Sequence, residues 1–303
     1  MAIYSIKDLE KLSDIKAHTI RVWEQRYSIV EPKRTSTNIR YYSDEDLKKL
    51  LNIALLNKNG YKISKIAKMT RLEIAQKVAD ISEVNFENAT QLDALTISMI
   101  EMDEYKFDRI ISTNINQIGF ESTMLEIINP FLDKLSLLWL TGSINPAQEH
   151  FISCLIRQKI IVAIDKEPYS ENPDAPKFLL FLPEGNTDEL SLLFLHYIIK
   201  SRGNKVIYLG QNIPFQDIKA VFEIHQPEYI YSIISEVFTK EPVQRYIERI
   251  GNAFSKSNII LTGYRVLAQP LLCPKNIHIH ENLGQTISLL NTLKTRETTY
   301  STK

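Results

Sequence analysis

The side chains best suited to chemistry in this chain lie in a short segment near its start, where residues 19–27 read TIRVWEQRY. Ile20 and Trp23 are three residues apart, so both can face a core when the segment is helical. The other side of the helix then carries arginine, whose planar guanidinium donates paired hydrogen bonds to guanine edges and phosphates. This pattern predicts a helix that lies in the major groove of DNA. The residues expected to bear on the groove are Thr19, Arg21, Arg26 and Trp23, the last mainly by positioning the helix.

Segments on either side of this helix complete a DNA-binding motif. Upstream, Ser5 is followed three residues later by Asp8, much as in a capping box, which predicts the start of a preceding helix and hence a helix-turn-helix. Downstream, residues 32–42 are basic and aromatic, which is typical of a β-wing that contacts the DNA backbone or minor groove. The residues expected to hold this wing on DNA are Lys33, Arg34, Arg40 and Tyr41.

The charge distribution supports a nucleic-acid-binding head. Residues 1–72 contain fifteen Lys and Arg against eight Asp and Glu, whereas the whole chain of 303 residues has a net charge of zero. The remaining residues are therefore acidic overall. Because binding to phosphates depends on local rather than total positive charge, this separation predicts a DNA-binding module joined to a module with another role.

The head resembles the MerR family of bacterial transcription regulators, in particular the subgroup that reads TIRVWEQRY at its recognition helix. The similarity runs from about residue 4 to residue 69 and includes the acidic helix start at residues 44–47. The resemblance implies a winged helix-turn-helix over residues 1–75 and sequence-specific binding to double-stranded promoter or operator DNA. It also implies RNA polymerase as a partner at the promoter.

A helical region follows the head. Apolar residues recur at spacings of three and four over residues 89–102, 104–118, 121–140 and 146–165, with Gly119 among the separators. Short connections between such helices favour antiparallel neighbours, so residues 89–167 are expected to form a four-helix bundle. Residues 76–88 are expected to be a linker. A second linker is expected at residues 168–176, where three prolines exclude a regular element.

Beyond the second linker, short apolar runs alternate with helical stretches. Runs of strand length occur at residues 177–182, 205–209, 229–234, 258–261 and 277–280. Such alternation requires a parallel sheet with crossover helices. Residues 177–303 are therefore expected to form a five-stranded α/β domain with a flavodoxin-like strand order, in which a ligand crevice lies at the carboxyl ends of the strands.

The order of head, bundle and α/β domain resembles the cobalamin-binding, light-sensing regulators of the CarH/LitR type. Residues 182–185 and 203–210 look like the first βαβ unit of their cobalamin domain. The resemblance implies an inherited cobalamin site. On this chain its positions are Trp139, Glu149 and His150 in the bundle, and Asp188, Ser232 and Gly263 in the α/β domain.

The sequence departs from this cobalamin motif at the positions that would hold cobalt. The resemblance places the lower histidine ligand at Asp188 and a second histidine ligand at Leu140. A carboxylate is a harder donor than imidazole and brings a charge that needs its own partner. Thr262 and Tyr264 flank Gly263 where the family has further glycine, and both would crowd the nucleotide tail. We therefore expect impaired cobalamin binding. The uses left open for the domain are cobalamin bound with its own base attached and without a protein ligand, binding of another ligand, or packing alone.

Two other functions are left open by the sequence. One is an adenosylcobalamin-dependent, light-sensing regulator, and the more distant one is the corrinoid protein of a methyltransferase system. The second requires the missing histidine ligand and leaves the head unexplained. No Ser-His-Asp order, P-loop or paired-carboxylate spacing is evident, so we expect no catalytic residues and no enzyme activity.

The remaining reactive side chains point to packing. His278 and His280 share one face of a predicted strand, without a third ligand nearby in the sequence, so a polar strand face is expected and no metal site. Cys154 and Cys273 are far apart in the sequence and are expected to be buried small apolar residues.

Assembly and location follow from the same features. No apolar run reaches the length of a membrane span and no secretory signal is evident, so the cytoplasm is expected and no membrane. A single helix-turn-helix rarely binds tightly enough alone, so we expect a homo-oligomer, a dimer or tetramer. Because residues 80–88 are polar and interrupt the apolar periodicity, self-association is expected to depend on residues 89–303.

Overall fold

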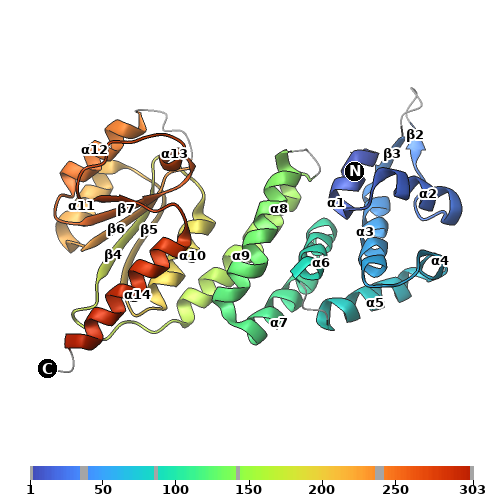
Figure 1. The fold of residues 1–303 in the computed structure, drawn as a ribbon, viewed down its shortest axis with the longest axis horizontal. Helices are drawn as coiled ribbons and strands as arrows, with labels where there is room; N and C mark the ends of the chain where they lie inside the picture. Colours follow the sequence, from blue (N-terminus) through green and yellow to red (C-terminus); the bar gives the residue numbers. More distant parts are fainter. Residues whose placement is uncertain (1–2, 35–39, 85–87, 141–143, 236–241, 301–303) are drawn as a thin grey trace. The chain divides into compact units, whose positions relative to one another are not determined.

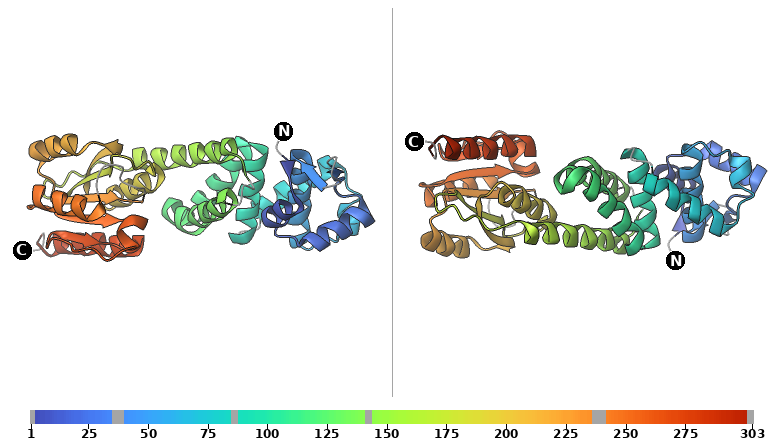
Figure 2. Two further views of the ribbon diagram at one scale, coloured as in Figure 1. Left: turned by 90° about the horizontal axis from the view of Figure 1, so that it is seen from above. Right: turned by 90° about the horizontal axis from the view of Figure 1, so that it is seen from below.

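The computed structural model describes residues 3–34, 40–84, 88–140, 144–235 and 242–300 (Figure 1). The chain divides into two compact units, residues 1–155 and 156–303. The boundary falls within α9 (Pro146–Lys166) and not in the proline-rich segment where sequence predicts a linker. Figure 2 shows α9 as one uninterrupted helix.

The first unit begins with the predicted helix-turn-helix. Ser5 and Asp8 form the capping box expected from the sequence, with both the side-chain and backbone bonds present. Three short strands pair in the order β1-β3-β2, all antiparallel. The elements of this head are β1 (Ile3–Tyr4), α1 (Ile6–Ser13), α2 (Ala17–Tyr27), β2 (Lys33–Arg34), β3 (Arg40–Ser43), α3 (Asp44–Lys58), α4 (Ile63–Ile66) and α5 (Arg71–Val84).

Helix α5 changes the expected organisation after the head. It extends to Val84, so most of the segment expected to be a linker is helical. The first and last helices of the next region start and end within one residue of the predicted positions. The helix expected over residues 121–140 is instead divided among the end of α7, a π-helix and α8. Gly119 adopts φ of 82°, a left-handed conformation that interrupts α7. These elements are α6 (Asn88–Glu101), α7 (Glu104–Thr123), the π-helix η1 (Met124–Ile128), α8 (Asn129–Leu140) and α9.

Helix α6 forms the centre of the first unit. Its apolar Leu95 and its polar Gln91 are both fully buried, because the helix packs against α3 on one side and against α7, η1 and α8 elsewhere. Asp93 of α6 binds Lys58 at the end of α3 at 2.7 Å and Lys134 of α8 at 3.1 Å. The head and the following helices therefore share one core.

The second unit contains the predicted parallel sheet. Its five strands follow the order β5-β4-β6-β7-β8, which is the flavodoxin-like order expected from the alternating pattern. The strand order reverses beside β4, between β5 and β6. The elements are β4 (Lys177–Pro183), α10 (Glu189–Lys200), β5 (Lys205–Ile213), α11 (Phe215–His225), β6 (Tyr229–Ile233), α12 (Val243–Ala253), β7 (Asn258–Thr262), α13 (Tyr264–Leu267), β8 (Ile277–Ile279) and α14 (Leu283–Tyr300).

Helices cover both faces of this sheet (Figure 1). On one face, Phe222 of α11 and Phe254, just after α12, pack with Leu179 and Leu261 of the strands in one apolar cluster. On the other face lie α10 and α14, and Tyr231 of β6 is hydrogen-bonded to Thr286 of α14 at 2.9 Å. The central strands β4, β6 and β7 are buried on both sides, which explains their nearly continuous apolar sequences.

No helix in the described ranges combines the length and apolar character that a membrane span requires.

Candidate nucleic-acid interface and ligand crevice

The predicted recognition helix, α2, is held in the head by its apolar side. Ile20 and Trp23 are buried, with 1% and 7% of their surfaces exposed. Arg21 and Arg26 are exposed on the opposite side, and Thr19 is partly exposed beside them. Trp23 therefore anchors α2 in the head by its burial, while its expected role toward DNA, mainly positioning the helix, stays a prediction.

The structure adds residues to this surface that the sequence reasoning missed. His18, Val22 and Gln25 are also exposed. With Arg21 they follow helical spacing that starts at His18, so they form one stripe along α2 with the two arginines. Val22 keeps 41% of its surface exposed although it is apolar. An exposed methyl-bearing side chain between two arginines is suited to contact a thymine methyl group. The missed signal was the i, i+3, i+4, i+7 spacing of these residues.

Glu24 connects α2 to the strand behind the wing. Its carboxylate accepts a hydrogen bond from Tyr42 Oη at 3.3 Å and lies 3.6 Å from Arg40 Nε. Tyr42 is fully buried, and burial together with the nearby charge of Glu24 raises the pKa of Tyr42 to about 12. Arg40, expected to contact DNA, is therefore also a structural partner of α2.

The other predicted wing residues lie on the antiparallel ribbon β2–β3. Lys33 and Arg34 of β2 are exposed, and they pair in register with Tyr41 and Arg40 of β3. The tip between these strands, residues 35–39, lies outside the described residues. The ribbon thus presents two exposed cations in the same head as α2.

The predicted ligand crevice corresponds to the carboxyl ends of β4 and β6, where the strand order reverses. The loop after β4 is tied to neighbouring strands at two points. The backbone N–H of Gly185 donates to Asn212 Oδ1 at 2.9 Å, and the N–H of Ser235 donates to Asn186 Oδ1 at 3.0 Å. Asn186 is only 2% exposed, so its side chain occupies the interior of this loop region.

The position that would ligate cobalt is also engaged locally. Asp188 precedes the first turn of α10, and its carboxylate accepts a hydrogen bond from Ser191 Oγ at 3.0 Å. Ser232 of β6 is fully buried and donates its hydroxyl hydrogen to the carbonyl of Phe181 at 2.9 Å. The donor set of this loop therefore does not fit coordination of cobalt through a protein imidazole.

Gly263 is required by the sheet itself. Its φ is 107°, and a Cβ at this position would lie 2.6 Å from the carbonyl oxygen of Ile234. The same carbonyl accepts a hydrogen bond from the N–H of Arg265 at 3.1 Å. The neighbouring Tyr264 is 70% exposed. The backbone at this carboxyl end is thus closely packed against the end of β6.

The predicted bundle residues belong to the first unit. Trp139 lies in α8, and its side chain is outside the described residues. Glu149 and His150 lie in the first turns of α9, where His150 is exposed and Glu149 is partly buried and accepts a hydrogen bond from Ser153 Oγ at 3.5 Å.

Two further expectations concern histidine and cysteine. His280 bonds through Nδ1 to Thr286 Oγ1 at 2.8 Å and meets Tyr231 edge-on, so it contributes to the packing of α14 on the sheet. Within the described residues no group of three or more potential ligands for a metal occurs. The expectation for cysteine was wrong, because Cys154 and Cys273 are both exposed. Cys154 lies on the exposed side of α9, and Cys273 lies in the segment between α13 and β8.

Two models of known protein families match segments within the first 163 residues of the chain. Residues 4–73 match the MerR HTH family regulatory protein, and residues 91–163 match a B12 binding domain. The second match spans most of α6–α9.

Two curated transcriptional repressors are similar to most of this chain, and a third regulator is similar to a shorter part of it. The HTH-type transcriptional repressor CarH of Myxococcus xanthus is 23% identical over 234 residues, which cover 75% of this chain and 77% of CarH. The repressor CarA of the same organism is 26% identical over 211 residues, covering 69% of this chain and 68% of CarA. The regulator MlrA of Escherichia coli is 35% identical over 66 residues, covering 22% and 27% of the two chains.

Among solved structures, the monomethylamine corrinoid protein of Methanosarcina barkeri has a similar fold. It superposes with a TM-score of 0.53 at 10% identity, covering 67% of this chain and 98% of the corrinoid protein. At this identity the likeness concerns the fold alone. Together the comparisons establish a MerR HTH domain followed by a B12 binding domain, in a chain homologous to the repressors CarH and CarA.

Proposed function

We propose that this chain, a MerR-type DNA-binding transcriptional regulator with a B12 binding domain, reads its operator through the exposed stripe of α2. The observation that carries the proposal is the division of α2 into two sides. Ile20 and Trp23 fix the helix to the core, while Arg21, Val22 and Arg26 face outward. A helix held in this way presents its side chains to the major groove without loss of packing.

The two kinds of exposed residue have different roles in this proposal. Arg21 and Arg26 bind base edges, where a bidentate contact discriminates between sequences by about 1–3 kcal/mol. Lys33 and Arg34 of the ribbon bind phosphates, which add affinity without sequence preference. Arg40 acts mainly by holding Glu24, and so keeps α2 and the ribbon in a fixed relation.

We infer that the C-terminal domain serves sensing or oligomerisation, and that its binding of cobalamin is impaired. Support comes from the carboxylate at Asp188, from the engaged Ser232 hydroxyl, and from the close packing around Gly263. An adenosylcobalamin-dependent regulator is the alternative within the same class, and the B12 binding domain over residues 91–163 favours it. A role in a methyltransferase system has only the likeness of fold in its favour.

We infer that two heads bind adjacent half-sites, because one head supplies too few contacts at physiological salt. The partners in this scheme are double-stranded promoter DNA, RNA polymerase at that promoter, and further copies of the chain. The site of action is the cytoplasm.

The proposal is tested by separating specificity from affinity. Full-length protein selects an operator from a random duplex pool, and binding of Arg21→Ala and Lys33→Ala is then measured on the selected and on a scrambled duplex. Arg21→Ala is expected to reduce the preference for the operator by about 10- to 100-fold. Lys33→Ala should weaken both duplexes by the same factor. Equal effects of the two variants on both duplexes would contradict the assigned roles.

A further inference from the structure

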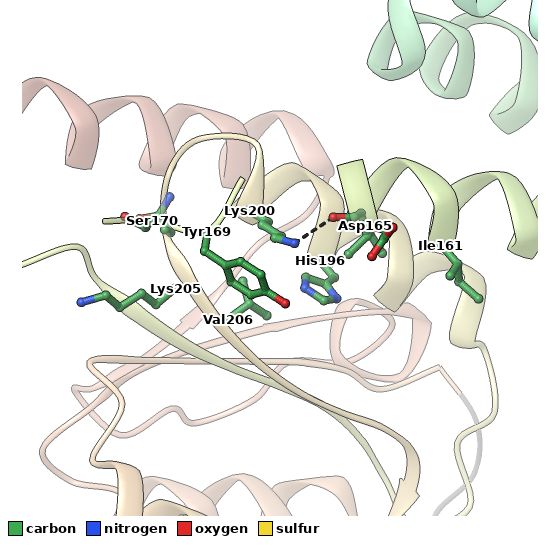
Figure 3. A pocket seen from close by; sticks show the side chains of 10 residues that line it. Ile161, Asp165, Tyr169, Ser170, His196, Lys200, Lys205 and Val206 are labelled. Atoms are coloured by element: carbon green, nitrogen blue, oxygen red, sulfur yellow. Dashed lines mark hydrogen bonds between the residues drawn. The ribbon is translucent and has the colours of Figure 1, made fainter. Parts of the chain in front are cut away.

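A pocket lies in the second unit beside the amino end of the edge strand β5 (Figure 3). Its volume is about 420 Å³, within the range of about 300–1,000 Å³ that small-molecule sites occupy. Its walls come from α9, from the segment after α9, from α10 and from the start of β5. The apolar part of the wall consists of Ile161, Ile164 and Val206.

The pocket is distinct from the ligand crevice described above. Lys205 and Val206, which line it, are the first residues of β5, whereas Asp188 and Gly263 follow the carboxyl ends of β4 and β7. Because the strands are parallel, the start of β5 lies at the amino ends of the strands, whereas Asp188 and Gly263 lie at their carboxyl ends. None of the six positions named above for the inherited cobalamin site is among the residues that line the pocket.

Lys200 and Asp165, a cation and an anion, both line this pocket without forming an ion pair with each other. Lys200 Nζ donates to the carbonyl of Ile164 at 2.8 Å and lies 4.7 Å from the centre of the Tyr169 ring, which leaves hydrogens of the ammonium group for another acceptor. Asp165 lines the same wall of α9, next to Ile164. Lys205 directs its ammonium group to the carbonyl of Pro173 at 2.7 Å, away from the centre of the pocket in Figure 3.

A further polar group that lines the pocket is the imidazole of His196. Its ring stacks on Tyr208 of β5 at a centroid distance of 5.2 Å. Burial, and secondarily the charge of Lys200, lower the pKa of His196 to about 4, so the ring is neutral at neutral pH. A neutral imidazole offers one donor and one acceptor and adds no charge. The pocket therefore presents one cation, one anion and an apolar wall.

We propose that this pocket binds a zwitterionic amino compound, namely an α-amino acid with an apolar side chain. The carboxylate of the ligand pairs with Lys200 and its ammonium group with Asp165, near the negative end of the α9 helix dipole. The apolar side chain contacts Ile161, Ile164 and Val206. A ligand with a single charge pairs with either Lys200 or Asp165 but not with both, so it loses one charge-assisted contact.

Binding has a structural consequence within this unit. Ile161, Ile164 and Asp165 belong to α9, whereas His196 and Lys200 belong to α10. Arg157 of α9 already lies 3.3 Å from Glu189 in the first turn of α10. Lys200 of α10 also donates to the carbonyl of Ile164 in α9. An amino acid in the pocket adds a further connection between the two helices, and so restricts the motion of α9 against the sheet.

The test uses three probes of nearly equal shape. L-Leucine carries both charges, 4-methylpentanoate lacks the ammonium group, and isopentylamine lacks the carboxylate. Each is titrated into full-length protein with isotope-labelled isoleucine and valine methyl groups. L-Leucine is expected to shift the methyl signals of Ile161, Ile164 and Val206 in a saturable way, with the other two probes at least about tenfold weaker. Ile234, which follows the carboxyl end of β6, serves as the reference signal.

Two variants assign the charges. Asp165→Asn is expected to weaken L-leucine about tenfold and to leave 4-methylpentanoate unchanged. Lys200→Gln should weaken L-leucine by a similar factor and leave isopentylamine unchanged. Asp165 is exposed, so Asp165→Asn is expected to fold normally. It therefore remains a valid test even if Lys200→Gln fails to fold. The proposal is overturned if L-leucine causes no saturable shift, if all three probes bind equally, if Ile234 shifts with the pocket signals, or if Asp165→Asn binds L-leucine like the unchanged protein.

Discussion

The carboxylate of Glu24 in α2 accepts a hydrogen bond from the hydroxyl of Tyr42 in β3, with 3.3 Å between the two oxygens. Glu24 is also 3.6 Å from Arg40 Nε. A carboxylate in the helix that we propose to read DNA is unfavourable near phosphates unless a hydrogen-bond donor or a cation pairs with it. Here Tyr42 and Arg40 both interact with the carboxylate of Glu24, and they join α2 to the ribbon that carries Lys33 and Arg34.

The first prediction tests this connection. Tyr42→Phe removes one hydrogen bond from Glu24 and is expected to destabilise the packing of α2 by about 1 kcal/mol. Hydrogen–deuterium exchange of the full chain should show about fivefold faster exchange in α2. Tyr41→Phe, in the adjacent position of β3, is the control and should leave exchange in α2 unchanged. Unchanged exchange in Tyr42→Phe would mean that the packing of Ile20 and Trp23 alone holds the helix.

The second prediction concerns Gly263. Gly263→Ala combines a positive φ with a Cβ 2.6 Å from the carbonyl oxygen of Ile234, so we expect it to destabilise the second unit by about 2–4 kcal/mol. Gly203→Ala is the matched control. Its φ is 81° but no atom lies within 4 Å of the added Cβ, so only the backbone strain of about 1 kcal/mol remains. Denaturant unfolding of both variants measures the difference, and equal losses would exclude a steric role for the Ile234 carbonyl.

The third prediction concerns cobalamin. After incubation with adenosylcobalamin and removal of free cofactor, the unchanged protein should retain little corrinoid absorption. Asp188→His should improve retention modestly, because imidazole is the better donor to cobalt while Thr262 and Tyr264 are unchanged. Asp188→Asn removes the charge without adding a donor and should not improve it. A light-dependent loss of operator binding by the unchanged protein would show that a photolabile cofactor binds without either histidine.

The fourth prediction follows from the lowered pKa of His196. The unfolded chain binds the proton with a pKa of about 6.5, whereas the folded protein has a pKa of about 4. His196 therefore contributes stability that is present above pH 6.5 and is lost as the pH falls through 4. The charged or titratable groups near the ring are Lys200, Tyr208 and Asp165, together with Glu189, which accepts from Tyr208.

Its measurement compares the unchanged protein with His196→Phe, which keeps an aromatic ring against Tyr208. Between pH 7 and pH 4.5 the unchanged protein should lose about 2 kcal/mol more stability than the variant, after allowance for partial exposure of the ring. Parallel losses in both proteins would show that carboxylates alone determine the acid sensitivity.

The fifth prediction concerns assembly. Because one head makes too few contacts, the full-length protein should be at least dimeric at micromolar concentration when bound to DNA. Analytical ultracentrifugation of free and DNA-bound protein measures this directly. A monomer in both states would exclude binding to paired half-sites.

Several features could be predicted from the sequence because they depend on neighbouring residues. The capping box at Ser5 and Asp8 requires only a spacing of three, and the burial of Ile20 and Trp23 follows from helical periodicity. The parallel sheet of the α/β domain follows from the alternation of short apolar runs with helices, because parallel strands need crossovers. The break at Gly119 follows from the conformational freedom of glycine.

Other features depend on contacts between residues far apart in the chain, and only the tertiary structure decided them. Arg40 of β3 pairs with Glu24 of α2. Helix α6 is buried on several sides because α3 and α8 pack against it. The pocket with Lys200 and Asp165 arises where α9, α10 and β5 come together. Local periodicity determines which side of an element is apolar, but which element covers that side, and which charges it brings, is determined by the packing of the whole unit.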